Sequence, residues 1–191
     1  NPRICSMDLF AYLHMDARGD ETGIPQGWSL EPFAPEDLPP LKDFYQRKSG
    51  GLLLDALGIG MSYPDEEPLE EIYRRLGLIR QTRLYALRRG AELKAAFIVD
   101  KSDRGVNLSD LLNCIKVIVV DETLPWEVMR SAVGLLSRVY TSEQIPVLTY
   151  PADYPEQAAG IAVERSYYLW IQDSRYAEQY VAYMKKQIEA N

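Results

Sequence analysis

Residues 114–120 (CIKVIVV) constrain the fold more than any other segment, because this run is almost continuously apolar. A strand with one face in water alternates apolar and polar residues, whereas a strand covered on both faces is apolar throughout. The run therefore predicts a central strand of a sheet that carries helices on both faces. A chain of 191 residues is long enough to bury such a core in one domain of ordinary size.

Helical and strand patterns around this run have the order of an α/β protein with a mixed sheet. Strand patterns at 83–87 and 93–100 flank a turn at Arg89-Gly90, which predicts an antiparallel hairpin. Further helices are expected at 52–57, 68–76, 123–140, 153–162 and from 174 onward, and further strands at 146–150 and 166–173. The predicted fold class is therefore α/β (α+β), a mixed central sheet with helices on both faces.

Residues 28–45 predict a strand that runs into a proline-bearing turn and then an amphipathic helix. Pro35 precedes Glu36 and Asp37, and carboxylates early in a helix are stabilised by the positive end of its dipole. Apolar residues then recur at helical spacing, at Leu38, Leu41, Phe44 and Tyr45. The phrase GWSLEPFAPEDLPPLKDFY resembles the opening of the GCN5-related N-acyltransferase (GNAT) family, and the element order as far as residue 187 is similar to that of the family.

The resemblance implies a site for an acyl-CoA, such as acetyl-CoA, and for an amine substrate whose identity stays open. In GNAT enzymes the acyl-CoA lies where two central parallel strands separate, which here are the strands expected at 114–120 and 146–150. Its pyrophosphate is bound by backbone N–H groups at the start of the following helix, because a helix N-terminus attracts anions. The matching positions of this chain are Val119, Val120, Asp121, Glu122, Thr123 and Trp126.

The matching loop departs from the family's pattern at the residues that would contact the pyrophosphate. GNAT members carry a glycine-rich loop that opens with Arg or Gln, whereas residues 121–126 (DETLPW) contain no glycine and no basic residue. Asp121 and Glu122 would repel a pyrophosphate, and Pro125 removes one N–H donor. The residues themselves favour a structural interpretation, in which Asp121, Glu122 and Thr123 cap the next helix.

Two tyrosines are the candidates for a general acid that protonates the departing thiolate. Many GNAT members carry such a tyrosine on the helix after the fifth strand, but the middle of the helix expected at 153–162 has none. Tyr150 and Tyr154 flank the start of that helix, and edge packing with a hydrated hydroxyl is the alternative for both. His14, the one histidine, is expected to be a packed or surface imidazole instead of a general base.

Metal and phosphate chemistry receive little support from the sequence. Cys5 and Cys114 lie far apart and one histidine completes no ligand cluster, so no disulfide framework and no metal site are predicted. Cys114 is interpreted as a buried, inert thiol. Residues 101–107 (KSDRGVN) offer Lys101, Arg104, Gly105 and the Asn107 side chain as an alternative phosphate loop, although an ordinary connecting loop has the same composition.

The charge balance disfavours some classes of partner. The formal net charge of −7 and the isoelectric point near 4.9 argue against binding to nucleic acid or to an anionic membrane surface. Arginines cluster at 74–75, 80, 83 and 88–89 and are interpreted as solvated faces of helices and strands. No apolar run approaches the roughly 18 residues of a membrane-spanning helix and no signal-peptide pattern occurs, so a cytoplasmic location is expected.

The first 27 residues differ in pattern from the rest of the chain. Residues 8–15 alternate like a strand with apolar groups on both faces, and residues 16–26 are rich in Gly, Asp and Glu like a linker. Two units are predicted: an appended strand and linker at 1–27, interpreted as the tail of an upstream domain, and a GNAT-like domain at 28–191. With Asn1 in the first position, the chain is expected to be a piece of a longer protein.

Two kinds of function are expected from these observations. The first is an acyl-CoA-dependent N-acyltransferase acting on an amine. The second is a catalytically inactive GNAT-like module of a larger multidomain bacterial protein, used for sensing, interaction or dimerisation. The aromatic-rich segment 166–183 offers a surface for a partner or a second copy, although core packing accounts for most of these aromatic residues.

Overall fold

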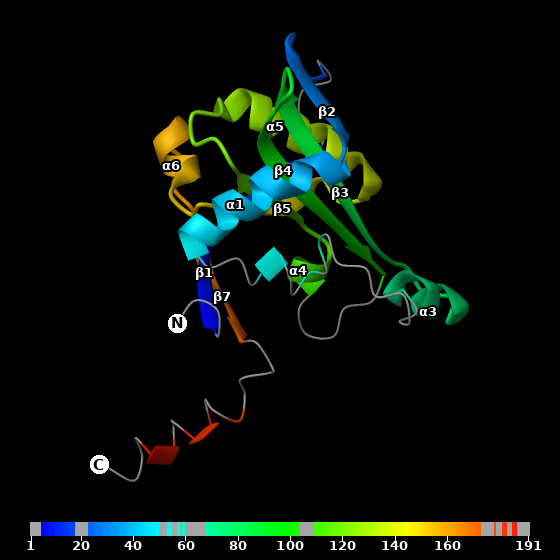
Figure 1. Cartoon of the computed structure of the whole chain (residues 1–191). Coiled ribbons are helices and arrows are strands. Elements are labelled where there is room, and N and C mark those ends of the chain that lie inside the picture. Colours follow the sequence, from blue (N-terminus) through cyan, green and yellow to red (C-terminus); the bar gives the residue numbers. More distant parts are fainter. Residues whose placement is uncertain are drawn as a thin grey trace.

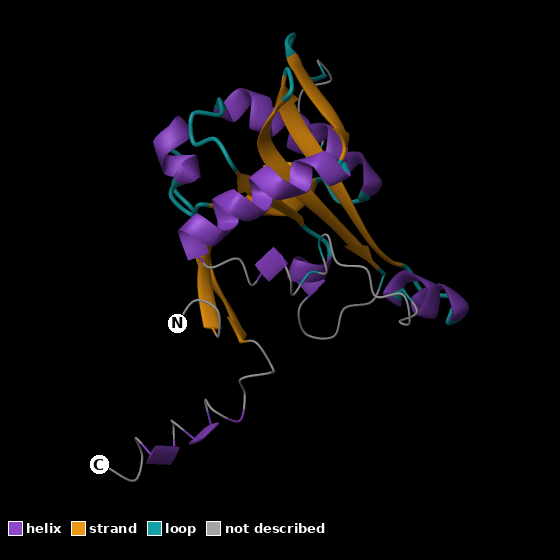
Figure 2. Cartoon of the chain, in the orientation of Figure 1, coloured by secondary structure: helices purple, strands orange, loops and turns teal. Residues whose placement is uncertain are grey.

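A seven-stranded mixed sheet organises the chain, and helices lie on both of its faces (Figure 1; Figure 2). The computed structural model describes residues 5–17, 23–49, 53–54, 57, 59, 68–103, 109–172, 178, 181–182 and 185–186. The strand order across the sheet is β2-β3-β4-β5-β6-β1-β7. The strands are β1 (Cys5–Asp16), β2 (Trp28–Pro32), β3 (Arg80–Arg89), β4 (Glu92–Ser102), β5 (Ile115–Val119), β6 (Gln144–Tyr150) and β7 (Arg165–Gln172). The predicted fold class is confirmed.

Among the described strands, one parallel pair lies at the centre of an otherwise antiparallel sheet. β3 and β4 form the predicted hairpin, and β4 also pairs antiparallel with β5. β5 pairs in parallel with β6 because the chain crosses between them through a helix. All five residues of β5 are buried, as the nearly continuous apolar sequence predicts.

The helices divide the core into two layers, one on each face of the sheet. They are α1 (Leu38–Ser49), α3 (Leu69–Arg75), α4 (Ser109–Leu112), α5 (Trp126–Leu136) and α6 (Tyr154–Ala159), with 3₁₀ turns η1 (Pro35–Asp37) and η2 (Ser137–Val139). The layer under α1 includes Phe10, Leu41, Phe44, Tyr45 and Tyr150. The layer under α5 and α6 includes Leu13, Val117, Met129, Val133 and Tyr154. No described helix combines the length and apolar character that crossing a bilayer requires.

The helix after β5 begins later than predicted. It was expected from residue 123, but α5 starts at Trp126. Residues 121–124 close a turn of their own, in which the Leu124 N–H donates to the Asp121 carbonyl oxygen at 2.9 Å. Pro125 then takes the N-cap position of α5, where its missing N–H costs no helical hydrogen bond.

Some predicted elements fall on residues that the structure does not describe. Within the helix expected at 52–57, Leu53 and Leu54 are helical and buried. Of the helix expected from residue 174, the structure describes residues 178, 181–182 and 185–186, and all of them are helical. The repeat of Tyr176, Tyr180, Met184 and Ile188 that predicted this helix lies outside the described residues, so its length stays a prediction.

β1 is an interior strand of the sheet. It pairs antiparallel with β6 on one side and with β7 on the other. Its alternate side chains supply both core layers, with Leu13 and Met15 on the α5 side and Phe10 and Tyr12 on the α1 side. The strand predicted at 8–15 is confirmed, and its apolar residues on both faces are explained by a position inside the sheet, where the sequence had suggested an appendage. An upstream domain stays a prediction.

Candidate functional site

The carboxyl end of the parallel pair, where the acyl-CoA was expected, is filled by aromatic rings. β5 and β6 stay in register up to Ile118↔Tyr150, so the strands are paired to the last residue of β6. The ring of Tyr150 stacks on that of Tyr45, with centroids 5.0 Å apart and an interplanar angle of 27°. It also meets the rings of Phe10 and Phe44, at centroid distances of 5.3 and 6.4 Å. Side chains of α1 and β1 therefore occupy this strand end on the α1 face.

Backbone N–H groups of the loop after β5 are engaged within the protein. Val119 is the buried last residue of β5, and the N–H groups of Val120 and Asp121 both donate to the Lys94 carbonyl oxygen, at 2.9 and 3.1 Å. The N–H of Thr123 donates to Asp121 Oδ1 at 2.9 Å. Four N–H groups of the loop, those of Val120, Asp121, Thr123 and Leu124, are therefore not free to bind a pyrophosphate.

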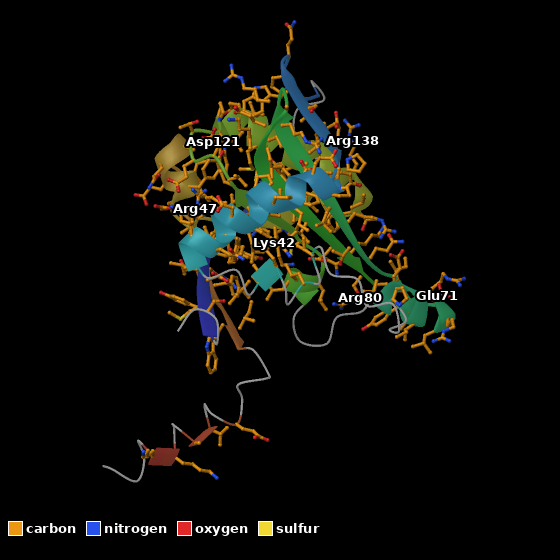
Figure 3. All side chains as sticks on the ribbon, viewed as in Figure 1. Lys42, Arg47, Glu71, Arg80, Asp121 and Arg138 are labelled. Atoms are coloured by element: carbon orange, nitrogen blue, oxygen red, sulfur yellow. The ribbon has the colours of Figure 1, made fainter. Side chains whose placement is uncertain are left out.

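The carboxylates of this loop are paired with lysines. Asp121 lies between β5 and α5 (Figure 3), where the Thr123 hydroxyl at 2.6 Å and the Lys94 ammonium at 2.9 Å lower the pKa of Asp121 to about 2. Glu122 forms an ion pair of 2.6 Å with Lys48 of α1. A pyrophosphate at neutral pH would meet the negative charge of Asp121 and would have to displace Asp121 and Glu122 from their lysines.

The helix caps predicted in this loop are wrong, because the acidic residues close the turn that precedes α5. Asp121 accepts both the N–H and the hydroxyl of Thr123, as Asp does in a turn of its own. Trp126 opens α5, and its ring lies with its centroid 6.1 Å from that of Tyr154. The loop is thus fastened to the sheet, to α1 and to α6.

The two candidate general acids lie on opposite faces of the sheet. Tyr150 belongs to the layer under α1, whereas Tyr154 belongs to the layer under α5 and α6. The Tyr154 hydroxyl is buried and donates to the Leu124 carbonyl oxygen at 2.9 Å. Burial raises the pKa of Tyr154 far above its ordinary value. The two hydroxyls do not converge on one reacting atom, and that of Tyr154 has a structural hydrogen bond.

Replacing Tyr154 by Phe is expected to lower the free energy of unfolding by about 1 kcal/mol, because a buried carbonyl oxygen loses its donor. Urea denaturation measures this change. Tyr73→Phe is the matched control, since Tyr73 is only half-buried on α3, and a change within about 0.5 kcal/mol is expected for it. Equal effects of the two substitutions would contradict a structural role for the Tyr154 hydroxyl.

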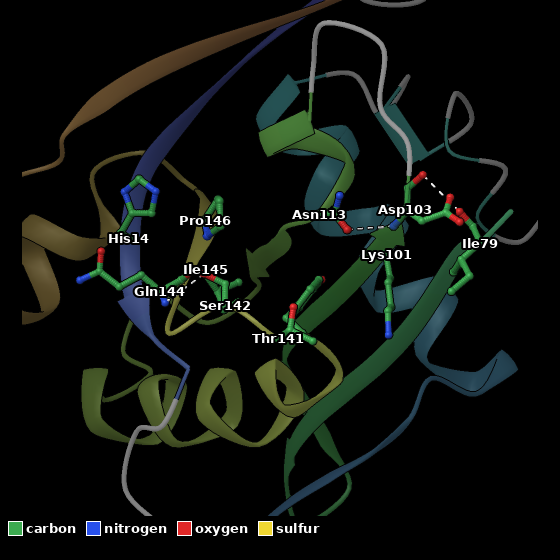
Figure 4. A pocket seen from close by; sticks show the side chains of 12 residues that line it. His14, Ile79, Lys101, Asp103, Asn113, Thr141, Ser142, Gln144, Ile145 and Pro146 are labelled. Atoms are coloured by element: carbon green, nitrogen blue, oxygen red, sulfur yellow. Dashed lines mark hydrogen bonds between the residues drawn. The ribbon is translucent and has the colours of Figure 1, made fainter.

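A cavity of about 520 Å³ lies at the other end of the parallel pair, where β5 and β6 begin (Figure 4). Its walls come from β1, from the residue before β3, from the end of β4, from the segment between α4 and β5, and from the segment that leads from η2 into β6. The lining residues are His14, Ile79, Lys101, Ser102, Asp103, Asn113, Tyr140, Thr141, Ser142, Gln144, Ile145 and Pro146. This volume is in the range of small-molecule sites. The sequence interpretation had placed the ligand at the opposite end of the same strands.

His14 is held in place at one wall of the cavity by a carboxylate. Its Nδ1 lies 2.9 Å from Oε2 of Glu164, and its backbone N–H donates to Oε1 of the same carboxylate at 2.8 Å. The bond from the His14 N–H and then that from the ring lower the pKa of Glu164. The Tyr12 hydroxyl lies 3.2 Å from Nε2. A carboxylate that orients a histidine ring is a frequent feature of acid–base and binding sites.

Hydrogen bonds also order the opposite side of the cavity. The Tyr140 hydroxyl lies 2.6 Å from the Asp100 carbonyl oxygen and 2.9 Å from that of Cys114, and burial raises the pKa of Tyr140. The Ser102 N–H donates to Asn113 Oδ1 at 2.9 Å. These bonds connect the end of β4 to the start of β5, so the wall between them is preorganised. Cys114 is buried, as predicted.

Lys101 and Asp103 give the cavity charges of both signs, and Figure 4 shows them across the cavity from His14. Lys101 belongs to the loop weighed as an alternative phosphate site. The other proposed residues of that loop, Arg104, Gly105 and Asn107, lie outside the described residues. Glu164 was missed because no local pattern marks it. Only the pairing of Tyr12 with Arg165 brings it beside His14.

No protein-family model matches the chain, and no curated protein is significantly similar to it in sequence. Within the described ranges, no group of three or more potential metal-ligating side chains comes together. Function is therefore inferred from the geometry of the two ends of the parallel strand pair.

Proposed function

We propose that this chain is a GNAT-like domain that does not catalyse acyl transfer and acts as a ligand-sensing module. The observation that carries the proposal is the closed carboxyl end of the parallel pair. There Tyr150 is stacked on Tyr45, and the strands are paired to the last residue of β6. A pantetheine chain bound between these strands would have to break backbone hydrogen bonds and displace buried aromatic rings.

A GNAT-like origin is supported by the arrangement of elements around the central strands. The hairpin β3–β4 precedes β5, and the one described parallel pair follows in the place where the family separates its strands. Acyl-CoA-dependent N-acylation of an amine is the second candidate function, and this parallel pair is the observation that favours it. Against it stand the engaged N–H groups and the two carboxylates of the loop.

The cavity at the amino end of the pair is the proposed ligand site. It combines an oriented imidazole at His14, an ammonium at Lys101 and a carboxylate at Asp103 with apolar and hydroxyl groups. Such a lining suits a small polar molecule that carries both charges, since each charge then finds a partner of the opposite sign. Preorganised walls reduce the ordering cost of binding.

Acetyl-CoA and CoA at millimolar concentration are expected to leave the melting temperature of the full chain unchanged. A ligand at 100 times its dissociation constant would stabilise the fold by roughly 2.7 kcal/mol. For a domain of this size that corresponds to a shift of about 5–10 °C. Differential scanning fluorimetry, followed by calorimetry, measures the shift.

A saturable shift with acetyl-CoA would contradict the proposal if the cofactor binds at the loop before α5, where the acyltransferase site was expected. Two charge variants then locate the ligand. Glu122→Lys, in the loop before α5, should enlarge the shift if the pyrophosphate binds there. Asp103→Lys, in the cavity where β5 and β6 begin, should enlarge the shift only if the pyrophosphate binds in that cavity. A shift that neither substitution alters would exclude both positions.

A further inference from the structure

β1 and β7 form a two-stranded arm that extends beyond the rest of the sheet. β1 pairs with β6 only from Ala11 to Asp16, whereas it pairs with β7 from Cys5 to Tyr12. Residues 5–10 of β1 therefore have β7 as their sole neighbour among the described strands. Figure 1 shows the ends of these two strands projecting away from the body of the sheet. Two-stranded ribbons are marginally stable on their own, so an arm of this kind gains from further pairing.

One face of the arm exposes large apolar side chains next to one another. Met7 pairs with Trp170, and Leu9 pairs with Tyr168, so all four lie on the same face. The exposed fractions are 63 % for Met7, 56 % for Trp170 and 61 % for Tyr168. Leu13 and Met15, on the same face of β1, belong to the core layer under α5 and α6. This face of the arm extends beyond the two helices. A cluster of this kind on a monomer indicates an interaction surface.

Within the part of the chain that the structure describes, the outer edge of β7 has few of the features that keep sheet edges apart. The other edge strand, β2, is five residues long and contains Glu31 and Pro32, both of which discourage pairing with another strand. β7 is eight residues long, and residues 166–172 (SYYLWIQ) contain no charge, proline or glycine. A strand of aromatic and β-branched residues at an unguarded edge is a template for another strand.

We propose that β7 pairs antiparallel with β7 of a second copy of this chain, about a two-fold axis at Leu169. In this register Tyr168 lies opposite the partner's Trp170, and Trp170 lies opposite the partner's Tyr168. Cross-strand aromatic pairs of this kind stabilise antiparallel sheets. The dimer goes beyond the proposed sensing function, because it is independent of which ligand the cavity takes.

A second copy fits this edge because the strand is self-complementary. Its one charged residue, Arg165, is at the end of the strand. In the proposed register the two Arg165 residues are eight positions apart, about 27 Å at 3.4 Å per residue. That separation exceeds the Debye length of about 8 Å at physiological salt, so their repulsion is screened. The two-fold axis limits the assembly to two copies. The outer strands of the joined described sheets are then the two β2 strands, whose Glu31 and Pro32 discourage further pairing.

The wild-type chain is expected to sediment with twice the chain mass of 21.8 kDa at about 100 µM, a concentration far above micromolar dissociation constants. Trp170→Lys places a charge on the edge and should reduce the mass to that of one chain. Leu76→Lys is the matched control, because Leu76 is equally exposed but lies after α3, and it should remain dimeric. Circular dichroism and melting curves verify that both variants are folded.

Complementary charges test the register. The variant Tyr168→Lys/Trp170→Lys and the variant Tyr168→Glu/Trp170→Glu should each be monomeric, and their mixture should recover a dimer with one copy of each. A monomeric wild-type chain would overturn the proposal. A dimer that persists in the Lys variant would also overturn it, since a different surface would then hold the copies together.

Discussion

Replacing Asp100 by Ala should lower the free energy of unfolding by about 3–5 kcal/mol, because it removes the counter-ion of a buried ammonium. Lys116 lies in the central strand β5, and its Nζ donates to the Asp100 carboxylate and lies 3.4 Å from the Leu111 carbonyl oxygen. Both side chains of the pair are largely buried. Without Asp100, the ammonium has no carboxylate partner at this position.

Removing both charges of the pair is expected to cost much less than removing one of them. Lys116→Met keeps an unbranched side chain of similar volume in β5, but on its own it leaves the Asp100 carboxylate without its ammonium. Buried ion pairs replaced by apolar groups of matching shape are often neutral or stabilising. Lys116→Met combined with Asp100→Asn should therefore be much closer in stability to the wild type than Asp100→Ala alone. Urea denaturation of the three variants measures the difference, and a loss for the double variant as large as that of Asp100→Ala would contradict it.

The pH dependence provides an independent test of this pair. Burial alone would lower the pKa of Lys116, but the neighbouring Cys114 sulfur and the Asp100 carboxylate raise it above its ordinary value. A raised pKa in the folded state contributes stability below the unfolded pKa of about 10.4, and this stability is lost as pH rises through the folded pKa. The destabilisation of Asp100→Ala should therefore shrink toward alkaline pH. Asp103→Ala, an exposed carboxylate nearby, should show no such trend.

Asp37→Ala is expected to cost about 3 kcal/mol, because Asp37 joins the start of α1 to β3 through a buried ion pair. Its carboxylate accepts from Nε of Arg88 at 2.9 Å and from a terminal guanidinium nitrogen of the same residue. The hydrogen bond to Asp37 raises the pKa of Arg88. Asp37 also accepts the Ala34 N–H at 2.8 Å, which closes the helix start.

Two comparisons separate the parts of this effect. Asp37→Asn keeps an oxygen for the Ala34 N–H and loses the charge, so its cost should lie between that of Asp37→Ala and zero. Asp43→Ala breaks an exposed pair with Arg47 on the same helix and should cost less than about 0.5 kcal/mol. Thermal and urea unfolding measure both. Equal losses for Asp37→Ala and Asp43→Ala would show that the buried ion pair between Asp37 and Arg88 contributes no more to the free energy of unfolding than an exposed pair.

Arg88 is a residue whose environment could not be predicted from its sequence pattern. The arginine cluster was interpreted as solvated faces, and this holds for Arg74, which pairs with Glu71 on the surface. It is wrong for Arg88, whose side chain is largely buried between Asp37 and Glu31. Sequence spacing does not reveal this difference, because the partners lie 51 and 57 residues away and meet only through the packing of α1 on the sheet.

The site shows the same division between local and long-range information. The sequence alone predicted that the loop at 121–126 is poor for pyrophosphate, because charge and the missing glycine are local properties. It did not predict that Tyr150 and Tyr154, four residues apart, belong to opposite faces of the sheet. Nor did it predict the cavity, whose walls come from five separate segments.

The sequence by itself determined the elements: the buried central strand, the hairpin before it and the strand at residues 8–15 follow from periodicity, turn residues and apolar runs over a few neighbouring positions. The tertiary structure alone decided where those elements lie. β1 was recognised as a strand, but its place between β6 and β7 depends on partners at least 128 residues away. Strand order arises from the burial of whole faces against one another, and no short window of sequence carries that information.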